Sequence, residues 1–425
     1  MVPNGWEFTT FEHHIDLLSG FAFKSAQYTE NSDDIRLLRG DNIAPNTLRW
    51  DGVKTWDKHQ YAELQKYHLR ENDFVIAMDR TWVSSGLKVA EVTKNDLPCL
   101  LVQRVARIRS LPTLEQSLLR QYFSSHRFEQ YVKGVQTETA VPHISSKQIK
   151  EFPLLLPPLP EQRKIAQILS TWDRGIATTE KLIDASKQQK KALMQQLLTG
   201  KKRLIDPETG KAFQGEWEEV RLSALSIKGK GNFTDGDWIE SPYIADSGCR
   251  LIQTGNIGVG CFKNKAKKYI SEASFVELKC KEVKVNDLLI CRLAEPAGRA
   301  CVVPDIGERK MLTSVDVTIM RVDKTKSSPE YLSYFFSLDH TLYTVTTLCG
   351  GSTRSRISRT NLGRMKIFLP ALNEQQKIAA VLSAADKEIE LLEAKLAHFM
   401  QEKKALMQQL LTGKRRVKVA ETEAA

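Results

Sequence analysis

Residues 190–201 read KKALMQQLLTGK, and residues 403–414 repeat the same twelve letters 213 positions later. At the same offset, LPPLPEQ at Leu156–Gln162 returns as LPALNEQ at Leu369–Gln375. Further upstream the correspondence weakens but keeps its register within a residue, as in Asn72–Ile76 against Asn286–Ile290. Self-similarity over a long, fixed offset indicates a duplicated architecture. We therefore predict two copies whose C-terminal portions are nearly identical and whose preceding portions have diverged.

The C-terminal portion of each copy is predicted to be a long coiled-coil helix. Apolar positions step by four and three, which keeps one stripe of a helix facing a partner helix. The positions are Ile165, Leu169, Trp172, Ile176, Thr179, Ile183, Ser186, Lys190, Leu193 and Leu197, then Ile378, Leu382, Ala385, Ile389, Leu392, Leu396, Phe399, Lys403, Leu406 and Leu410. Pro160 suits a first turn, Asn373 an N-cap, and Gly200 and Gly413 the residue after a helix. A packed surface helix is the alternative.

Connectivity predicts the direction of the two helices. The first leaves one globular portion and ends at the other, so a second helix that pairs with it runs back, and the pair is antiparallel. Each helix is about 57 Å long at 1.5 Å per residue. Three polar seam positions, Thr179, Ser186 and Lys190, either weaken the pairing, set its register, or receive helices of a partner protein.

The predicted fold is mixed α/β (α+β), with two similar globular domains separated by two long antiparallel coiled-coil helices in a pseudo-two-fold tandem repeat. Strands are expected at 74–77, 102–108, 288–290 and 315–319, and helices at 114–132 and 329–343, from their apolar periodicity. The predicted boundaries are 1–155 for the first globular domain, 156–200 for the first helix, 201–216 for a linker, 217–368 for the second globular domain, 369–413 for the second helix and 414–425 for a flexible tail of mixed charge.

Charge favours an acidic partner. The formal net charge is +11 and the pI is about 9.2, and nucleic acid is the partner class that this charge favours most. Basic and polar residues that fall in predicted loops are the candidate DNA contacts, because Lys and Arg bind phosphates and Arg and Gln read base edges. These residues are Arg80, Lys88, Lys133, Gln136, His143, Lys147, Lys263, Lys265, Lys267, Lys268, Arg292, Arg299, Arg354, Arg356 and Arg359. Solvated surface loops are the alternative interpretation.

Catalytic and compartment signals are weak. The sequence has no G-x-x-x-x-G-K-[ST] phosphate loop, and no spacing supports a catalytic triad or a paired-carboxylate site, so no catalytic residue is predicted. Seven cysteines without a C-x-x-C pair predict reduced thiols and no metal site, and no cofactor is expected. Without a run of eighteen apolar residues or a secretory signal, the chain is predicted to be cytoplasmic.

Taken together, the repeated Leu-Pro-x-Leu-x-Glu-Gln entry, the diverged domains and the long helices resemble the specificity subunit of Type I restriction–modification enzymes. The resemblance covers the full length. It implies a non-catalytic subunit with two target recognition domains, each reading one half of a split, asymmetric double-stranded DNA target. It also implies that the helices set the gap and dock two methyltransferase (modification) subunits, which restriction (motor-nuclease) subunits then join.

The resemblance places partner-binding residues on the helices. The candidates are Ile165, Leu169, Trp172, Ile176, Ile378, Leu382, Ile389 and Leu392. Three alternatives remain at this stage: a coiled-coil scaffold whose globular ends bind proteins, an unrecognised enzyme, and the specificity subunit of an orphan DNA-adenine methyltransferase that lacks a nuclease.

Overall fold

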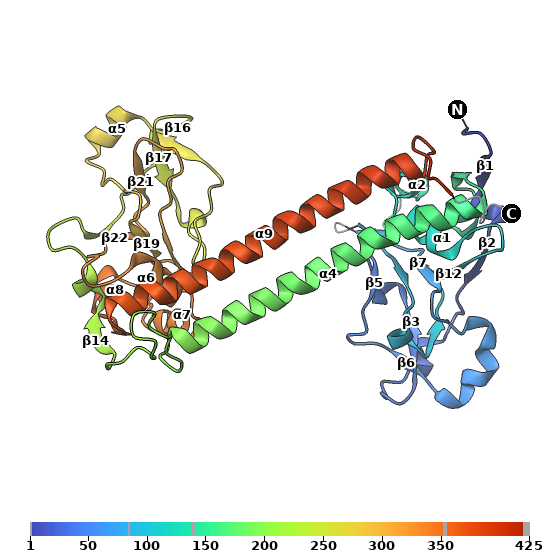
Figure 1. The fold of residues 1–425 in the computed structure, drawn as a ribbon, viewed down its shortest axis with the longest axis horizontal. Coiled ribbons are helices and arrows are strands. Elements are labelled where there is room, and N and C mark those ends of the chain that lie inside the picture. The colour runs from blue at the N-terminus through green and yellow to red at the C-terminus, as the bar shows by residue number, and fades with distance from the viewer. Residues whose placement is uncertain (1, 84–85, 138–140, 352–354, 420–425) are drawn as a thin grey trace. The chain divides into compact units, whose positions relative to one another are not determined.

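The computed structural model describes residues 2–83, 86–137, 141–351 and 355–419 (Figure 1). Contacts divide the chain into two compact units, Met1–Lys181 with Ala394–Ala425 and Leu182–Glu393, called unit 1 and unit 2 below. The boundaries fall inside the two long helices. Each unit therefore combines one globular region with a segment of both helices.

The globular region of unit 1 rests on a four-stranded antiparallel sheet in the order β10-β7-β12-β2. A second sheet, β11-β3-β6, contains the parallel pair β11–β3. The strands are β1 Glu7–Thr10, β2 Ile15–Ser19, β3 Ile35–Leu38, β4 Ile43–Ala44, β5 Thr47–Leu48, β6 Thr55–Trp56, β7 Phe74–Ala77, β8 Trp82–Val83, β9 Gly86–Leu87, β10 Val89–Glu91, β11 Cys99–Leu101, β12 Val105–Ser110 and β13 Pro153–Leu156; the α-helices are α1 Gln116–Phe123, α2 His126–Val135 and α3 Ser146–Lys150.

Unit 2 repeats this topology. Its four-stranded antiparallel sheet has the order β15-β22-β19-β20, and its second sheet contains the parallel pair β17–β21. The strands are β14 Glu218–Arg221, β15 Phe233–Asp235, β16 Ile244–Ala245, β17 Cys249–Ile252, β18 Lys268–Ile270, β19 Leu288–Cys291, β20 Ala300–Val302, β21 Met311–Thr313, β22 Val317–Met320 and β23 Lys366–Leu369; the α-helices are α5 Glu272–Glu277, α6 Pro329–Phe335, α7 Asp339–Thr347 and α8 Arg359–Arg364.

A matched glycine explains one shared feature of the two globular regions. A Cβ on Gly20 would lie 2.2 Å from the carbonyl oxygen of Val102, and a Cβ on Gly236 would lie 2.3 Å from that of Thr313. Only glycine allows the backbone to approach a neighbouring chain so closely. The same close approach of two backbone segments therefore occurs in both units, although the sequences around the two glycines differ.

Several short elements differ from the prediction. The strand expected at 102–108 is wrong as a single element, because β11 ends at Leu101 and β12 begins at Val105, with a turn between them. Both predicted helices in the globular regions are pairs: α1 and α2 meet at Ser125, whose hydroxyl accepts the N–H of Phe128, and α6 and α7 are separate. Apolar spacing does not separate one helix from two that face the same core.

The long helices α4 (Leu159–Leu197) and α9 (Leu372–Leu410) have 39 residues each, a few residues shorter than predicted at both ends. Pro160 lies in the first turn of α4 as expected, whereas Asn373 lies inside α9 and is not its N-cap. Gly200 and Gly413 adopt left-handed conformations just after the helices, with φ of 71° and 68°. The prediction of helix stops at these glycines is confirmed.

In each unit the α4 and α9 segments run antiparallel and share a core with the globular region. In unit 1, Ile165 and Leu169 of α4 are buried together with Met407 and Leu410 of α9. In unit 2, Leu197 of α4 shares a core with three buried residues of α9, Ile378, Ala379 and Leu382. Every seam position predicted above is buried or half-buried in the structure.

Two polar clusters cross these helix pairs at matched positions. In unit 1, Lys403 of α9 donates to Asp173 of α4 at 2.6 Å, and the Gln121 amide of α1 donates to the other carboxylate oxygen at 2.7 Å. In unit 2, Lys190 of α4 donates to Asp386 of α9.

The hydroxyl of Tyr334 in α6 completes the unit 2 cluster by donating to the second oxygen of Asp386 at 2.8 Å. Each cluster therefore joins both helices to the globular region of its unit. Lys190 is one of the polar seam residues, and its contact agrees with the register-setting interpretation.

The Glu-Gln dipeptide that begins each helix has two separate tasks. Arg416, after α9, binds the carboxylate of Glu161 with two guanidinium nitrogens, and Arg203, after α4, binds Glu374 in the same way. Gln162 accepts the N–H of Glu115 at the start of α1 and donates to two carbonyls; Gln375 accepts the N–H of Ser328 at the start of α6. The recurring motif thus ties each helix start to its globular region and to the end of the other helix.

We predict that Lys403→Met lowers the free energy of unfolding of unit 1 by about 1–3 kcal/mol, because Asp173 keeps its burial and loses its cation. Urea unfolding followed by circular dichroism measures the change. Lys187→Met is the control, since the Lys187–Glu393 pair is half-exposed and the expected change is below about 0.5 kcal/mol. Equal effects of the two substitutions would contradict the assignment of Lys403 to the register of the helices.

Candidate nucleic-acid interface

The loop that follows the central strand β7 brings basic residues together in unit 1. Arg80 is exposed and adopts a left-handed conformation (φ 46°), and its N–H donates to the carbonyl of Pro142 at 2.7 Å. His143 lies 2.6 Å from Asp79 through its Nδ1, and Asp79 also faces Arg104. A non-glycine residue held at positive φ costs about 1–2 kcal/mol, and such strain persists where the surroundings impose it, often at functional sites.

Other predicted residues of unit 1 surround this loop. Lys88 is half-buried, and burial lowers the pKa of its ammonium, with Arg80 and Asp79 close enough to add charge effects. The Lys133 ammonium lies 3.6 Å above the Trp82 ring. Gln136 carries a buried amide oxygen that has no hydrogen-bond partner among the described residues. Lys147 is exposed on α3 and pairs only loosely with Glu151, at 3.7 Å.

The matched loop of unit 2 carries different side chains. Arg356 occupies the place of His143. It forms an isolated backbone β-bridge with Leu293 after β19, as His143 does with Asp79 after β7. Its guanidinium lies 3.1 Å from Asp316. Arg356 and Arg359 are exposed, and a cavity of about 440 Å³ lies between Arg356, Arg292 and their neighbours. Arg354 lies outside the described residues.

Two predicted DNA contacts of unit 2 have structural roles instead. Arg292 is 2% exposed, bonds to the carbonyls of Val315 and Ile357, and pairs with Asp235 at 3.1 Å. Arg299 donates to four backbone carbonyls, those of Thr254, Ile257, Leu293 and Pro296. Both guanidinium groups are occupied in holding loops together. We therefore correct the prediction for these two residues and leave them out of the proposed interface.

The four lysines of the 263–268 segment are exposed, as a contact surface requires: Lys263, Lys265, Lys267 and Lys268. Their backbone is held from inside. The Asn256 amide donates to the carbonyls of Lys263 and Lys265, and the fully buried Arg250 donates to those of Lys265 and Lys268. The loop is therefore fixed while its ammonium groups remain in solvent.

Sequence reasoning missed the aromatic beside these lysines. Trp238 is 72% exposed and borders a cavity of about 230 Å³ that Lys268, Gln253 and Ser314 also line. The Ser314 hydroxyl is buried there without a hydrogen-bond partner among the described residues. Asp316 lines the same cavity and pairs with Arg356, so the lysine loop and the arginine loop form one continuous surface. No local sequence pattern indicated that Trp238 is exposed, because its exposure depends on tertiary contacts between residues far apart in the chain.

The helix residues predicted to bind partners are mostly used inside each unit. Ile165, Leu169, Ile378 and Leu382 are at most 1% exposed, and Ile389 is buried. Trp172 packs edge-on against Phe399, and Ile176 and Leu392 are half-buried on the seam. A buried side chain offers a partner no surface, so we correct this prediction for the five buried residues.

Groups typical of metal or thiol catalysis are not assembled in the described part of the chain. It holds no cluster of three His, Cys, Asp or Glu side chains able to bind a metal ion. The seven cysteines are unpaired, and burial raises the pKa of Cys99 and Cys301 to about 12. Among the described residues, no helix has the length and apolar character needed to cross a bilayer.

The family is evident from comparison with known proteins. A family model described as "Type I restriction modification DNA specificity domain" matches residues 3–188 and again residues 215–398. The chain belongs to this family, whose members are non-catalytic recognition subunits. Because the match occurs twice, it also confirms the predicted tandem repeat.

Individual relatives support the assignment. The chain is 37% identical over 182 residues to the "Type I restriction enzyme EcoAI specificity subunit" of Escherichia coli, a match that spans 43% of this chain and 30% of that protein. It is 26% identical over 306 residues, 70% of each chain, to the "Type I restriction enzyme MjaVIII specificity subunit" of Methanocaldococcus jannaschii.

A solved structure shows the same fold across nearly the whole chain. The "Type-I restriction-modification system S subunit from M. genitalium" has a TM-score of 0.58 and 14% identity, and it covers 97% of this chain and 98% of its own. At this identity the likeness concerns the fold alone.

We predict that Arg299→Ala lowers the free energy of unfolding of unit 2 by about 2–3 kcal/mol, because four carbonyls lose a charged donor. Arg356→Ala removes one half-exposed ion pair and should change it by less than about 1 kcal/mol. Urea unfolding measures both. If Arg356→Ala were the more damaging of the two, the division into structural and surface arginines would be wrong.

Proposed function

We propose that this chain is the DNA-recognition subunit of a Type I restriction–modification complex, and that each globular region (residues 1–155 and 217–368) reads one half of a split, asymmetric target. One observation carries the proposal. The two regions share strand order, yet the loop at the same place holds Asp79 with His143 in one and Leu293 with Arg356 in the other. One scaffold with different exposed side chains is what two different half-sites require.

The proposed contacts divide by chemistry. Exposed lysines neutralise phosphates, whereas a guanidinium fork pairs with guanine and a side-chain amide pairs with adenine. Arg80, Lys88, Lys133, Gln136, His143 and Lys147 form the proposed surface of the first globular region. Lys263, Lys265, Lys267, Lys268, Arg356 and Arg359 form that of the second, and we propose to include Trp238 and Gln253, which line the same cavity as Lys268.

The helices are proposed to set the gap between half-sites and to dock two methyltransferase subunits, which restriction subunits join. Both helices are unbroken over 39 residues, so their length is a defined quantity. Docking is proposed to use exposed apolar side chains of these helices, such as Leu182 and Leu391, which are 49% and 63% exposed. Double-stranded DNA and these two kinds of subunit are the proposed partners.

Exchanging residues 217–367 for the same segment of a relative tests the two-reader model. Methylation mapping of DNA from cells that express the chimera with its methyltransferase subunit gives the target. One half-site should change, while the other half-site and the gap stay the same, because the first globular region and both helices are untouched. A chimera that alters both half-sites, or the gap, would show that the globular regions do not read separately.

A second test concerns the lysine loop of the second globular region. Replacing Lys263, Lys265 and Lys267 by Gln should reduce the slope of log affinity against log salt by about 0.9 per lost phosphate contact, or about 2–3 in all. Duplex binding by the assembled methyltransferase complex between about 50 and 200 mM salt measures the slope. The control replaces Lys202 and Lys211 of the linker, which are also exposed, and should leave the slope unchanged. An unchanged slope for the loop variant would show that the lysine loop is not part of the DNA interface.

A further inference from the structure

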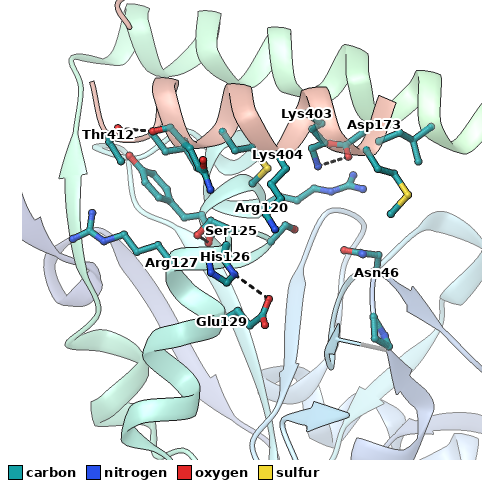
Figure 2. A pocket seen from close by; sticks show the side chains of 18 of the residues that line it. Asn46, Arg120, Ser125, His126, Arg127, Glu129, Asp173, Lys403, Lys404 and Thr412 are labelled. Carbon is teal, nitrogen blue, oxygen red and sulfur yellow. Dashed lines mark hydrogen bonds and ion pairs between the residues drawn. The ribbon is translucent and has the colours of Figure 1, made fainter. Parts of the chain in front are cut away.

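A groove of about 830 Å³ lies within unit 1, and its lining residues are not among the proposed DNA contacts (Figure 2). Its walls are the start of α2, the β4–β5 turn at Pro45–Thr47, and the facing sides of α4 and α9. Arg120, Arg127 and His126 line it from the globular region, and Lys403 and Lys404 line it from α9. Segments from four places in the chain therefore form a single concave surface.

The charge of the groove is unbalanced. Five of its lining residues are Lys or Arg, namely Arg120, Arg127, Lys403, Lys404 and Lys414; three are acidic, Glu129, Asp173 and Glu180. Some of these charges already have partners: Lys403 binds Asp173, Arg120 binds Glu91, and Glu129 binds Lys133. Lys404, Lys414 and Arg127 form no ion pair with any described residue. The available charge is thus positive.

The floor of the groove is apolar. Met400 and Met407 of α9 and Ile176 of α4 line it, and the Met400 side chain is 55% exposed. Methionine adapts its shape to varied partners and is common at binding surfaces. Cations placed around an exposed apolar floor match a ligand that carries both carboxylates and apolar groups.

The matched place in unit 2 has different charges. Asp339 stands where unit 1 has His126, and it pairs at 3.0 Å with Lys191, the counterpart of Lys404. Ser333 stands in place of Arg120, His340 in place of Arg127, and Glu390 in place of Ala177. The duplication has therefore kept the helix lysines and replaced the cations of the globular region. The excess positive charge belongs to unit 1.

We propose that this groove binds an acidic protein segment that also carries large apolar side chains, and that unit 2 does not bind the same segment. The carboxylates would meet Lys404, Lys414 and Arg127, while an apolar side chain covers Met400 and Ile176. Duplex DNA fits the cations better than the floor, because its charged sugar-phosphate backbone has no large apolar side chain to place on the methionines. This inference does not depend on which half-sites the chain reads.

Selection from a displayed library of random dodecapeptides on the full chain tests the proposal. Peptides that also bind the variant Arg127→Glu with Lys404→Glu are removed by counter-selection. The expected survivors are rich in Asp, Glu, Leu, Phe and Met, and a labelled survivor should bind the variant at least tenfold more weakly in fluorescence anisotropy. Survivors without acidic bias, or no survivors, would overturn the proposal.

Three single variants separate binding from folding. His126→Asp should give Lys404 an ion pair like that of Lys191 with Asp339. The affinity of the selected peptide should then fall about threefold to fivefold, as expected for a rim charge. Glu180→Gln removes a negative charge from the groove and should strengthen binding, which misfolding does not do. The reciprocal substitution Asp339→His, in unit 2, should leave the affinity of the selected peptide for the unit 1 groove unchanged. A peptide that ignores both His126→Asp and Glu180→Gln binds elsewhere and overturns the assignment.

The other class of ligand is tested in the same assay. Non-specific duplex DNA is added as a competitor at physiological salt. The proposal expects no displacement, because the groove residues are not among the proposed DNA contacts. Displacement of the peptide by the duplex would assign the groove to the DNA surface and overturn the proposal.

Discussion

The structure depends on a lysine–carboxylate contact that crosses the two long helices. Lys403 reaches Asp173 in unit 1 and Lys190 reaches Asp386 in unit 2, and a polar group of the globular region, Gln121 or Tyr334, takes the remaining carboxylate oxygen. A partly buried charge beside an apolar seam is favoured when it is paired, so registers of the helices that break the pair are disfavoured. The contact also joins the helix pair to α1 in unit 1 and to α6 in unit 2.

This arrangement explains why the helices have changed so little. Each helix gives its first half to one unit and its second half to the other, and the Arg after each helix binds the Glu that begins the other. A substitution of either residue therefore alters a contact between the two copies. Among the described residues, the globular loops proposed as DNA contacts form no such ion pair between the copies, and their side chains differ. His143 in one and Arg356 in the other occupy the same position.

Family membership makes DNA recognition the setting for these differences. Exposed cations on a rigid backbone are suited to that task. The lysine loop has such a backbone, because Arg250 and Asn256 donate to its carbonyls from within. Guanidinium groups also have a purely structural use, since Arg299 donates to four backbone carbonyls. Charge alone therefore does not identify a reader.

The sequence by itself determined the tandem repeat, the long helices, their glycine stops and the family, because these follow from exact repetition and from a short-range period of about 3.5 residues. It located the loops but not the function of each side chain: Arg292 and Arg299 are internal, and Trp238 is exposed. Nor did it predict that Ile165 and Ile378 are used inside each unit, or that α1 and α2 are separate helices. Whether a guanidinium meets a carbonyl or solvent depends on strands distant in the chain, so only the tertiary structure decided which residues form a surface.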